Sequence, residues 1–289
     1  MEGRDTTEKI ATEPALDDGE DCDCNGEAVS KVEIGSYKAK VEMITDPAEE
    51  ILLLWAFQQP TFSKPNAFVH HSSVDLHLDA CGHRLSIFQT PSSMSMPGVT
   101  GAVMWDSGVV LGKFLEHAVD MGRLAFQCKK TVELGSGCGL VGCIAALLGA
   151  EVVLTDLHDR LKLLKKNVDT NLDAGKLRSS ATVSELTWGD TVETELIQPS
   201  PDFILGSDVI YSEAAVSELV STLTQLSGRE TTIFLAGELR NDAVLEYFLD
   251  VAMEFFQIGH VDQTQWHPDY CSRRVAIFVL VKKTSNFKN

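Results

Sequence analysis

The chain has 289 residues, of which 44% are hydrophobic, and 24 Lys+Arg against 42 Asp+Glu give a net charge of −18 at pH 7. This composition supplies enough apolar side chains for one large domain, or at most two, and excludes disorder throughout. The acidic balance argues against a nucleic-acid-binding protein, because no basic face that could release counterions from phosphates is visible in the sequence. Seven cysteines in a chain of this length do not indicate a disulfide-stapled miniprotein.

Membrane and secretory segments are not indicated either. The longest uncharged apolar stretch, residues 140–150, is shorter than the ~18–20 residues that a bilayer span needs. The N-terminus opens with charged residues rather than with an apolar signal region. We therefore expect a protein of the cytoplasm, with the nucleus as a second location, that has reduced thiols and binds neither membrane nor nucleic acid.

Residues 1–30 carry ten acidic side chains, two basic ones and no aromatic residue. A segment of this kind cannot bury a core, so we predict an acidic disordered tail. Cys22 and Cys24 lie within it, but two thiolates without a second pair of ligands do not complete a tetrahedral metal site.

Residues 31–100 are expected to form an N-terminal extension made of a helix and a β-hairpin. Asp46 as N-cap, Pro47 at the first helical position and Glu49 in a capping box predict a helix over residues 47–58. Apolar and polar residues alternate on both sides of a turn at residues 79–82, which predicts the hairpin. His77, Cys81 and His83 fall on its polar face and in its turn, so we predict no metal site there.

Residues 101–289 show apolar strands alternating with helical stretches, the pattern of a parallel α/β sheet. Seven strands are predicted, at 131–135, 151–156, 181–188, 203–211, 231–238, 255–261 and 274–282. The last two are separated by a polar stretch instead of a crossover helix, so they should form an antiparallel hairpin. The expected fold class is α/β, with a seven-stranded, mostly parallel Rossmann-like sheet.

A glycine-rich turn follows the first of these strands, in the run Thr131-Val-Glu-Leu-Gly-Ser-Gly-Cys-Gly-Leu-Val-Gly142. Glycines at this place let a ligand approach the backbone closely. The spacing Gly137-x-Gly139-x-x-Gly142 also satisfies the dinucleotide fingerprint, so the loop by itself leaves NAD and S-adenosylmethionine open.

Two carboxylates beside the loop favour S-adenosylmethionine. Glu133 lies inside the strand, where burial of a carboxylate is costly unless a cation lies beside it. The ammonium group of an amino acid would supply that cation, whereas the carboxylate would repel the pyrophosphate of a dinucleotide. Asp156 ends the next strand, the usual place for an acid that binds ribose hydroxyls. Counted from Gly135, the third fingerprint glycine would fall on Leu140, which disfavours NAD.

Further side chains follow the later strands and should reach the same crevice, because ligands of such sheets lie at the carboxyl ends of the strands. Trp188 would lie beside adenine or serve as a core aromatic, and Asp208 and Tyr211 would close the fourth strand. Glu238 and Arg240 either select residues around the acceptor or form structural ion pairs. His158 either approaches the ribose or adenine or is an exposed loop residue.

Met104-Trp-Asp-Ser-Gly108, the glycine loop, Trp188-Gly189 and Asp208-x-x-Tyr211 occur together and in this order. In this combination the chain resembles methyltransferase family 16, the seven-β-strand protein-lysine methyltransferases, and most of all its group that methylates chaperones and AAA ATPases. The resemblance covers roughly residues 65–282. It implies S-adenosyl-L-methionine as cofactor and, as partner, a protein that presents a lysine. We expect the enzyme to be a monomer.

The resemblance also implies roles for individual residues. Trp105 would contact the cofactor, Glu133 its methionine amino group, Asp156 its ribose and Trp188 its adenine. Asp208 and Tyr211 would lie at the substrate lysine as the catalytic pair, and the expected cofactor-binding set is completed by Gly135, Gly137 and Ser207. No metal is expected.

A lysine ε-amine has a reference pKa of about 10.4 and attacks only when neutral. Asp208 would therefore serve more for capture and orientation than as a general base, and Tyr211 would orient the amine. A small-molecule N-methyltransferase, a non-catalytic cofactor-binding partner protein and a dehydrogenase remain alternative hypotheses. Cys138 and Cys143 have no neighbouring histidine in the sequence and are interpreted as packing residues.

Overall fold

A computed structural model describes residues 31–58, 66–95, 101–172 and 180–284. The predicted acidic tail, residues 1–30, lies outside these ranges, so its disorder stays a prediction. Among the described residues, none of the helices has both the length and the apolar character needed to cross a bilayer.

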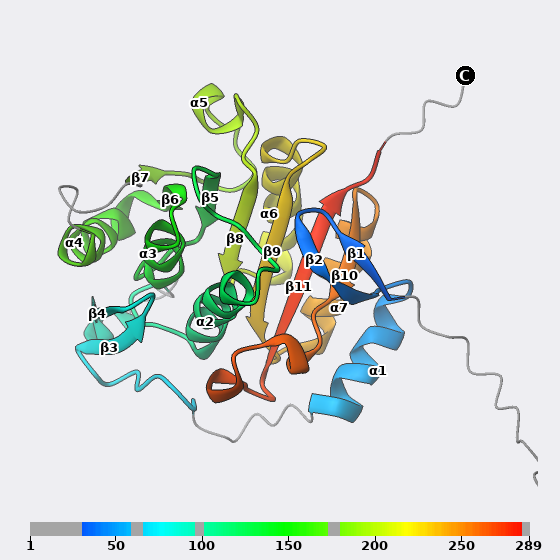
Figure 1. Cartoon of the computed structure of the whole chain (residues 1–289), viewed down its shortest axis with the longest axis horizontal. Coiled ribbons are helices and arrows are strands. Elements are labelled where there is room, and N and C mark those ends of the chain that lie inside the picture. Colours follow the sequence, from blue (N-terminus) through cyan, green and yellow to red (C-terminus); the bar gives the residue numbers. More distant parts are fainter. Residues whose placement is uncertain (1–30, 59–65, 96–100, 173–179, 285–289) are drawn as a thin grey trace, which may run out of the picture.

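The core of the molecule is a nine-stranded sheet with the order β1-β2-β10-β11-β9-β8-β5-β6-β7 (Figure 1). The five strands from β9 to β7 are mutually parallel, and β11 lies antiparallel between β9 and β10. The strands are β1 (Lys31–Ile34), β2 (Tyr37–Met43), β5 (Lys130–Leu134), β6 (Glu151–Asp156), β7 (Ala181–Glu185), β8 (Phe203–Ser207), β9 (Thr232–Glu238), β10 (Phe256–His260) and β11 (Val275–Lys282). All seven predicted strands are present, and the antiparallel C-terminal hairpin is confirmed.

Helices cover both faces of this sheet, which gives three layers (Figure 1). Neighbouring residues of one strand, such as Ile204 and Leu205, belong to different hydrophobic clusters, as expected for strands buried on both faces. One face packs against α2 (Asp106–Asp120), α3 (Leu140–Leu147) and α4 (Leu161–Asn171), and the other against α1 (Pro47–Gln58), α6 (Glu213–Leu226) and α7 (Asp242–Met253). A short helix, α5 (Thr194–Ile197), precedes β8.

Two strands were not predicted. β1 and β2 form a hairpin around Gly35, which has φ +57°, and β2 pairs with the β10 edge of the sheet. Residues 31–43 therefore extend the main sheet, although the sequence analysis assigned them to a separate extension. The signal was present, since Tyr37, Ala39 and Val41 alternate with charged residues. The boundary proposed between residues 100 and 101 stays a prediction.

The predicted helix near residue 47 and the predicted β3–β4 hairpin are both present. Asp46 accepts hydrogen bonds from the Ala48 and Glu49 amides at 2.8 and 3.1 Å, as an N-cap does. β3 (Asp75–Ala80) and β4 (His83–Phe88) form a separate sheet. Asn171 on α4 bonds both backbone groups of Ser86, and so substitutes for a neighbouring strand.

Asn167 on α4 ties this hairpin to the glycine loop. Its side chain bonds both backbone groups of Phe88 and donates to the Cys138 carbonyl at 2.9 Å. Two strands end more than one residue before the predicted position: β7 ends at Glu185 rather than 188, and β8 ends at Ser207 rather than 211. Trp188 and Tyr211 therefore lie on the loops that follow these strands, where side chains have freedom to turn into a site.

Candidate active site

A cavity opens at the carboxyl ends of β5, β6, β7 and β8, as expected for a parallel α/β sheet. All nine residues that the sequence analysis selected line it: Trp105, Glu133, Gly135, Gly137, Asp156, Trp188, Ser207, Asp208 and Tyr211. The structure thus brings the predicted site residues together in one place. Their individual roles stay predictions.

The glycine loop forms the floor of the cavity. Gly135, Gly137 and Gly139 have φ values of +58°, +53° and +81°, which side-chain-bearing residues rarely adopt. A Cβ added at Gly137 would lie 3.3 Å from the Gly101 carbonyl oxygen. At Gly142 a Cβ would collide with Leu154 and lie 2.5 Å from a carboxylate oxygen of Glu133. The loop therefore needs glycine both for its backbone conformation and for close packing.

Glu133 is 1% exposed and accepts a hydrogen bond from the Gly142 amide at 3.1 Å. Burial raises the pKa of its carboxyl to about 8, although hydrogen bonds oppose the shift. A buried carboxylate of this kind is stabilised when a cation enters beside it. The site therefore fits the amino group of a methionine moiety.

Asp156 holds the edge of the glycine loop. Its carboxylate accepts hydrogen bonds from the Gly137 amide at 2.6 Å and the Leu157 amide at 2.7 Å. Burial raises its pKa, while these two bonds and the charge of Arg160 lower it. The carboxylate is thus fixed by backbone groups, with its oxygens at the cavity wall where ribose hydroxyls can donate to them.

For Trp188 the sequence left open a place beside adenine or a role as a core aromatic, and its contact with adenine stays a prediction. Trp188 lines the cavity and also packs against the hydrophobic cluster under α6 and α7. Its ring centroid lies 6.2 Å from that of Tyr211, which is 46% exposed. Burial, followed by the charges of Asp156 and Glu218, raises the pKa of Tyr211, so its hydroxyl is neutral near pH 7.

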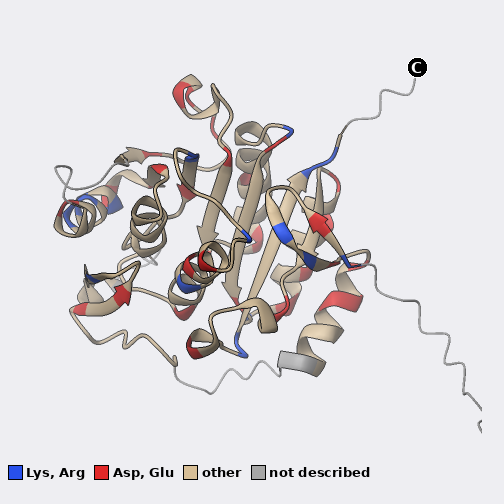
Figure 2. Cartoon of the chain, viewed as in Figure 1, with Lys and Arg blue, Asp and Glu red and all other residues tan. Residues whose placement is uncertain are grey.

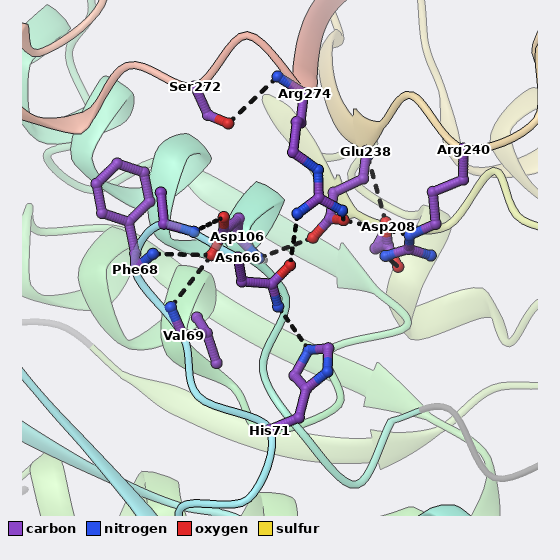
Figure 3. A network of polar contacts seen from close by, with 11 residues as sticks. Asn66, Phe68, Val69, His71, Asp106, Asp208, Glu238, Arg240, Ser272 and Arg274 are labelled. Atoms are coloured by element: carbon purple, nitrogen blue, oxygen red, sulfur yellow. Dashed lines mark hydrogen bonds and ion pairs between the residues drawn. The ribbon is translucent and has the colours of Figure 1, made fainter. Parts of the chain in front are cut away.

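Asp208 occupies the other end of the cavity, directly after β8, and has φ +60° (Figure 3). One carboxylate oxygen accepts from the Arg240 guanidinium at 2.7 Å, and the other from the Glu238 amide at 3.3 Å. Burial lowers the pKa of Arg240, but the Asp208 and Glu238 carboxylates raise it, and the net change is upward. Arg240 is therefore a permanent cation at this end.

Trp105 precedes α2 and joins two parts of the site. The Arg240 guanidinium lies 4.0 Å from the Trp105 ring centroid, and the His71 ring centroid lies at 4.4 Å. The next residue, Asp106, is fully buried and accepts from the amides of Ala67, Phe68 and Val69 at 2.6 to 3.2 Å (Figure 3). The Trp-Asp motif thus fastens the segment 66–71 against the site.

Several lining residues were not predicted, among them Gly101 and Arg160. Arg160 follows Asp156 by four residues in the same connection, so a basic residue so near the strand-ending acid was a usable signal. Nothing in the sequence marks Gly101, because its role depends on the close approach of Gly137. Glu238 and Arg240 form the ion pairs that were one of their two alternatives, and Arg240 also lines the cavity.

The remaining candidate residues are placed as follows. His158 has a largely exposed side chain and bonds Glu185 at 2.9 Å, in agreement with the loop alternative. Cys138 and Cys143 are buried, and burial raises the pKa of both thiols, that of Cys138 to about 12. Cys81 lies in the β3–β4 turn with φ +52°. Within the described ranges no group of three or more His, Cys, Asp or Glu side chains is arranged to hold a metal ion.

Comparison with known proteins identifies the family. A family model described as lysine methyltransferase matches residues 84–254. Protein N-lysine methyltransferase METTL21A of Danio rerio is 36% identical over 227 residues, which cover 78% of this chain and 94% of that protein. EEF1A lysine methyltransferase 3 of Xenopus tropicalis is 34% identical over 181 residues, which cover 62% of this chain and 75% of that protein.

Among solved structures, magnesium protoporphyrin IX methyltransferase from Synechocystis PCC 6803, with bound SAM, aligns with a TM-score of 0.44 and 16% identity over 62% of this chain and 80% of that chain. The assignment of the family depends on the family model and on the sequence relatives, whose coverage is far more extensive than a single motif. The chain belongs to the lysine methyltransferase family, and its methyl donor is S-adenosyl-L-methionine.

Proposed function

We propose that the acceptor of this S-adenosyl-L-methionine-dependent enzyme is the ε-amino group of a lysine on the surface of a folded protein, captured by Asp208 and Tyr211. The observation that carries the proposal is the form of the acceptor end of the cavity. Asp208 lies there with a side chain only 10% exposed, while Tyr211 beside it is 46% exposed. A long side chain can enter such an opening while the protein that bears it stays outside.

The chemistry asks mainly for positioning, because the sulfonium of the donor supplies an already activated methyl group. Glu133 would hold the amino group of the donor and Asp156 its ribose, with Trp105 and Trp188 as apolar walls. At the acceptor end, Asp208 draws in the lysine ammonium. The neutral Tyr211 hydroxyl accepts a hydrogen bond from the amine and turns its lone pair toward the methyl group.

The surroundings of the acceptor end suit a cationic segment of the substrate. Glu218 lines the cavity, and Asp242 lines a smaller hollow that shares Tyr211 and Arg240 with it. Acidic residues also occur along much of the ribbon, whereas α4 carries a group of lysines (Figure 2), namely Lys162, Lys165 and Lys166. A negative electrostatic potential attracts a basic substrate and orients its approach.

The first substrates to test come from two sources. One relative is named an EEF1A lysine methyltransferase, which makes translation elongation factor 1A a candidate. The resemblance of the sequence to the group acting on chaperones and AAA ATPases makes those proteins the other candidates. We propose that the enzyme acts on such a substrate as a monomer in the cytoplasm, with the nucleus as a second location.

The experiment measures transfer of a labelled methyl group from S-adenosylmethionine to proteins of a cell extract and to purified candidates, resolved on a gel. Gly137→Arg should abolish the labelled band, since the side chain would fill the cavity. The matched control is Gly82→Arg, because Gly82 also has a positive φ, +73°, but an added Cβ there meets nothing within 4 Å.

A protein band formed by the wild type and by Gly82→Arg, but not by Gly137→Arg, supports the proposal. A labelled product that passes a dialysis membrane, with no labelled protein, would instead indicate a small-molecule N-methyltransferase. Binding of S-adenosylmethionine without transfer to either acceptor would indicate a non-catalytic binding protein.

A further inference from the structure

Four charged side chains form a connected network behind the acceptor end: Asp208, Glu238, Arg240 and Arg274 (Figure 3). We infer that Arg240 is a positioning residue for methyl transfer, which holds Asp208 in place and offsets its charge so that the captured lysine can lose its proton. The inference rests on the proposed function, in which Asp208 captures the lysine.

The geometry of Arg240 suits this role. It follows β9, and its guanidinium donates to Asp208 at 2.7 Å and to Glu238 at 3.3 Å. The same guanidinium lies 4.0 Å from the centroid of the Trp105 ring, so its plane is held by an aromatic face as well as by two carboxylates. These contacts come from β8, β9 and the start of α2, and together they leave the guanidinium few alternative positions.

Glu238 anchors Arg240 from behind. Its side chain is 1% exposed, and one carboxylate oxygen binds both Arg240 and Arg274 while the other accepts from the Asp106 amide at 3.1 Å. Arg274 is itself held by Asn66, whose amide oxygen accepts from it at 3.1 Å. The position of Arg240 therefore depends on Glu238 in β9, on Asp106 at the start of α2 and on Arg274 directly before β11, which are far apart in the sequence.

The charges explain why such an anchor is needed. Two carboxylates and two guanidiniums balance one another in the network, and the guanidinium that contacts Asp208 is that of Arg240, which also lines the cavity. An uncompensated carboxylate next to the lysine would stabilise the ammonium and raise the pKa of the amine, which must be neutral to attack. With Arg240 in place, Asp208 still attracts the substrate but holds its proton less strongly.

The other titratable groups around the pair belong to the elements packed against it. They include His71, Asp106, Glu238, Arg274, Tyr211, Glu218 and Asp242. Asp242 already accepts a hydrogen bond from the Trp55 indole at 2.7 Å. Arg240 is the cation that directly contacts Asp208 in the described structure, so its removal should change the field at the acceptor more than any other single substitution of this group.

The test compares pH profiles of the methylation rate for wild type, Arg240→Gln, Arg240→Lys and the control Arg274→Gln, with a protein substrate found as above. For Arg240→Gln we expect a drop in kcat of about 10- to 100-fold near pH 7.5 and a shift of the rising limb toward higher pH by about one unit. Arg240→Lys should restore part of the profile, because the positive charge returns. Arg274→Gln should shift the limb much less, because Arg274 contacts Glu238 instead of Asp208.

Calorimetric binding of S-adenosylmethionine and the melting temperature are measured for every variant. The inference is overturned if kcat of Arg240→Gln falls equally at all pH values, or if this variant loses cofactor binding, since Arg240 would then have a structural or cofactor-binding role. If the wild-type enzyme transfers no methyl group to any protein, the proposed function is contradicted, and the inference, which rests on it, is contradicted as well. If the wild type methylates a protein but the pH profile of Arg240→Gln is not shifted, the inference is overturned while the proposed function stands.

Discussion

The two ends of the cavity hold their carboxylates in different ways. At the cofactor end, Glu133 and Asp156 accept hydrogen bonds from backbone amides of the glycine loop and its neighbours, all within residues 133–157. At the acceptor end, Asp208 is held by the Arg240 side chain and the Glu238 amide, and that network extends to α2, β11 and residue 66.

This difference has consequences for how each end responds to change. Backbone amides offset little of the cost of burial, so the pKa of Glu133 stays raised to about 8 until a cation arrives. The Arg240 side chain compensates the charge of Asp208 directly, but any member of that network can be removed by a single substitution. The cofactor end should therefore be sensitive to backbone geometry and the acceptor end to side-chain chemistry.

The largest effect is expected at Asp208. Asp208→Asn should lower the methylation rate by at least about 100-fold, as for loss of a preorganised charged group, while the Kd for S-adenosylmethionine stays within a few-fold. Asparagine is chosen because it tolerates the φ of +60°, whereas Asp208→Ala would add backbone strain to the loss of the carboxylate. Initial rates and titration calorimetry measure the two quantities.

Asp208→Ala should abolish methylation, and a melting temperature lower than that of Asp208→Asn should report the added backbone strain separately from the loss of the carboxylate. If Asp208→Asn lost cofactor binding as well as activity, Asp208 would belong to the cofactor end and the division between the two ends would be broken.

A smaller effect is expected at Glu133. Glu133→Gln keeps an acceptor for the Gly142 amide but removes the charge, so the Kd for S-adenosylmethionine should rise by about 10- to 100-fold, the range for hydrogen bonds to charged groups. Wild-type binding near pH 7 should also release protons, because Glu133 is mostly protonated below pH 8 and must ionise to meet the ammonium. The binding enthalpy measured in buffers of different ionisation enthalpy reports this release.

The same carboxyl affects the stability of the free enzyme. Its folded-state pKa, about 8, lies above the usual value of 4.5, so the free energy of unfolding should decrease as pH rises from about 5 through 8. Glu50, whose pKa burial raises to about 7, contributes in the same direction, so the contribution of Glu133 is read as the difference between wild type and Glu133→Gln. If proton release on binding of S-adenosylmethionine persisted in Glu133→Gln, the released proton would come from another group.

The smallest effect is expected from a methyl group in the loop. Gly142→Ala places a Cβ against Leu154 and Glu133, so it should reduce the free energy of unfolding by about 1–3 kcal/mol and weaken cofactor binding a few-fold. Gly237→Ala is the control, because an added Cβ there meets nothing within 4 Å. Urea unfolding measures the free energy of unfolding of both variants. Equal stability of the two variants would show that the loop adjusts and that the cofactor end is less rigid than its hydrogen bonds indicate.

The elements of this fold can be predicted best where the sequence signal is local. The strand, glycine turn and following acid around Glu133 and Asp156 follow one another in the chain, so their positions could be inferred from spacing alone. The β1–β2 hairpin, whose alternation is short, and the ends of β7 and β8 are less easily predicted. β7 stops at Glu185, where its partner β6 also ends, and β8 stops at Ser207, where its pairing with β9 ends although β9 continues to Glu238; the sequence of one strand does not contain this information.

The α/β class, nine of the cavity-lining residues and the carboxylates at both ends of the site could be inferred from the sequence alone, because hydrophobic periodicity and short motifs encode them within a few residues. The tertiary structure was needed to show that Arg240 and the Glu238 amide contact Asp208 and that Arg274 joins them through the Glu238 carboxylate. It was also needed to show that Asp106 fastens the segment 66–71 beside them. Ion pairs of this kind join strand ends that are more than thirty residues apart in some cases, and the sheet order that brings them together results from packing of the whole chain.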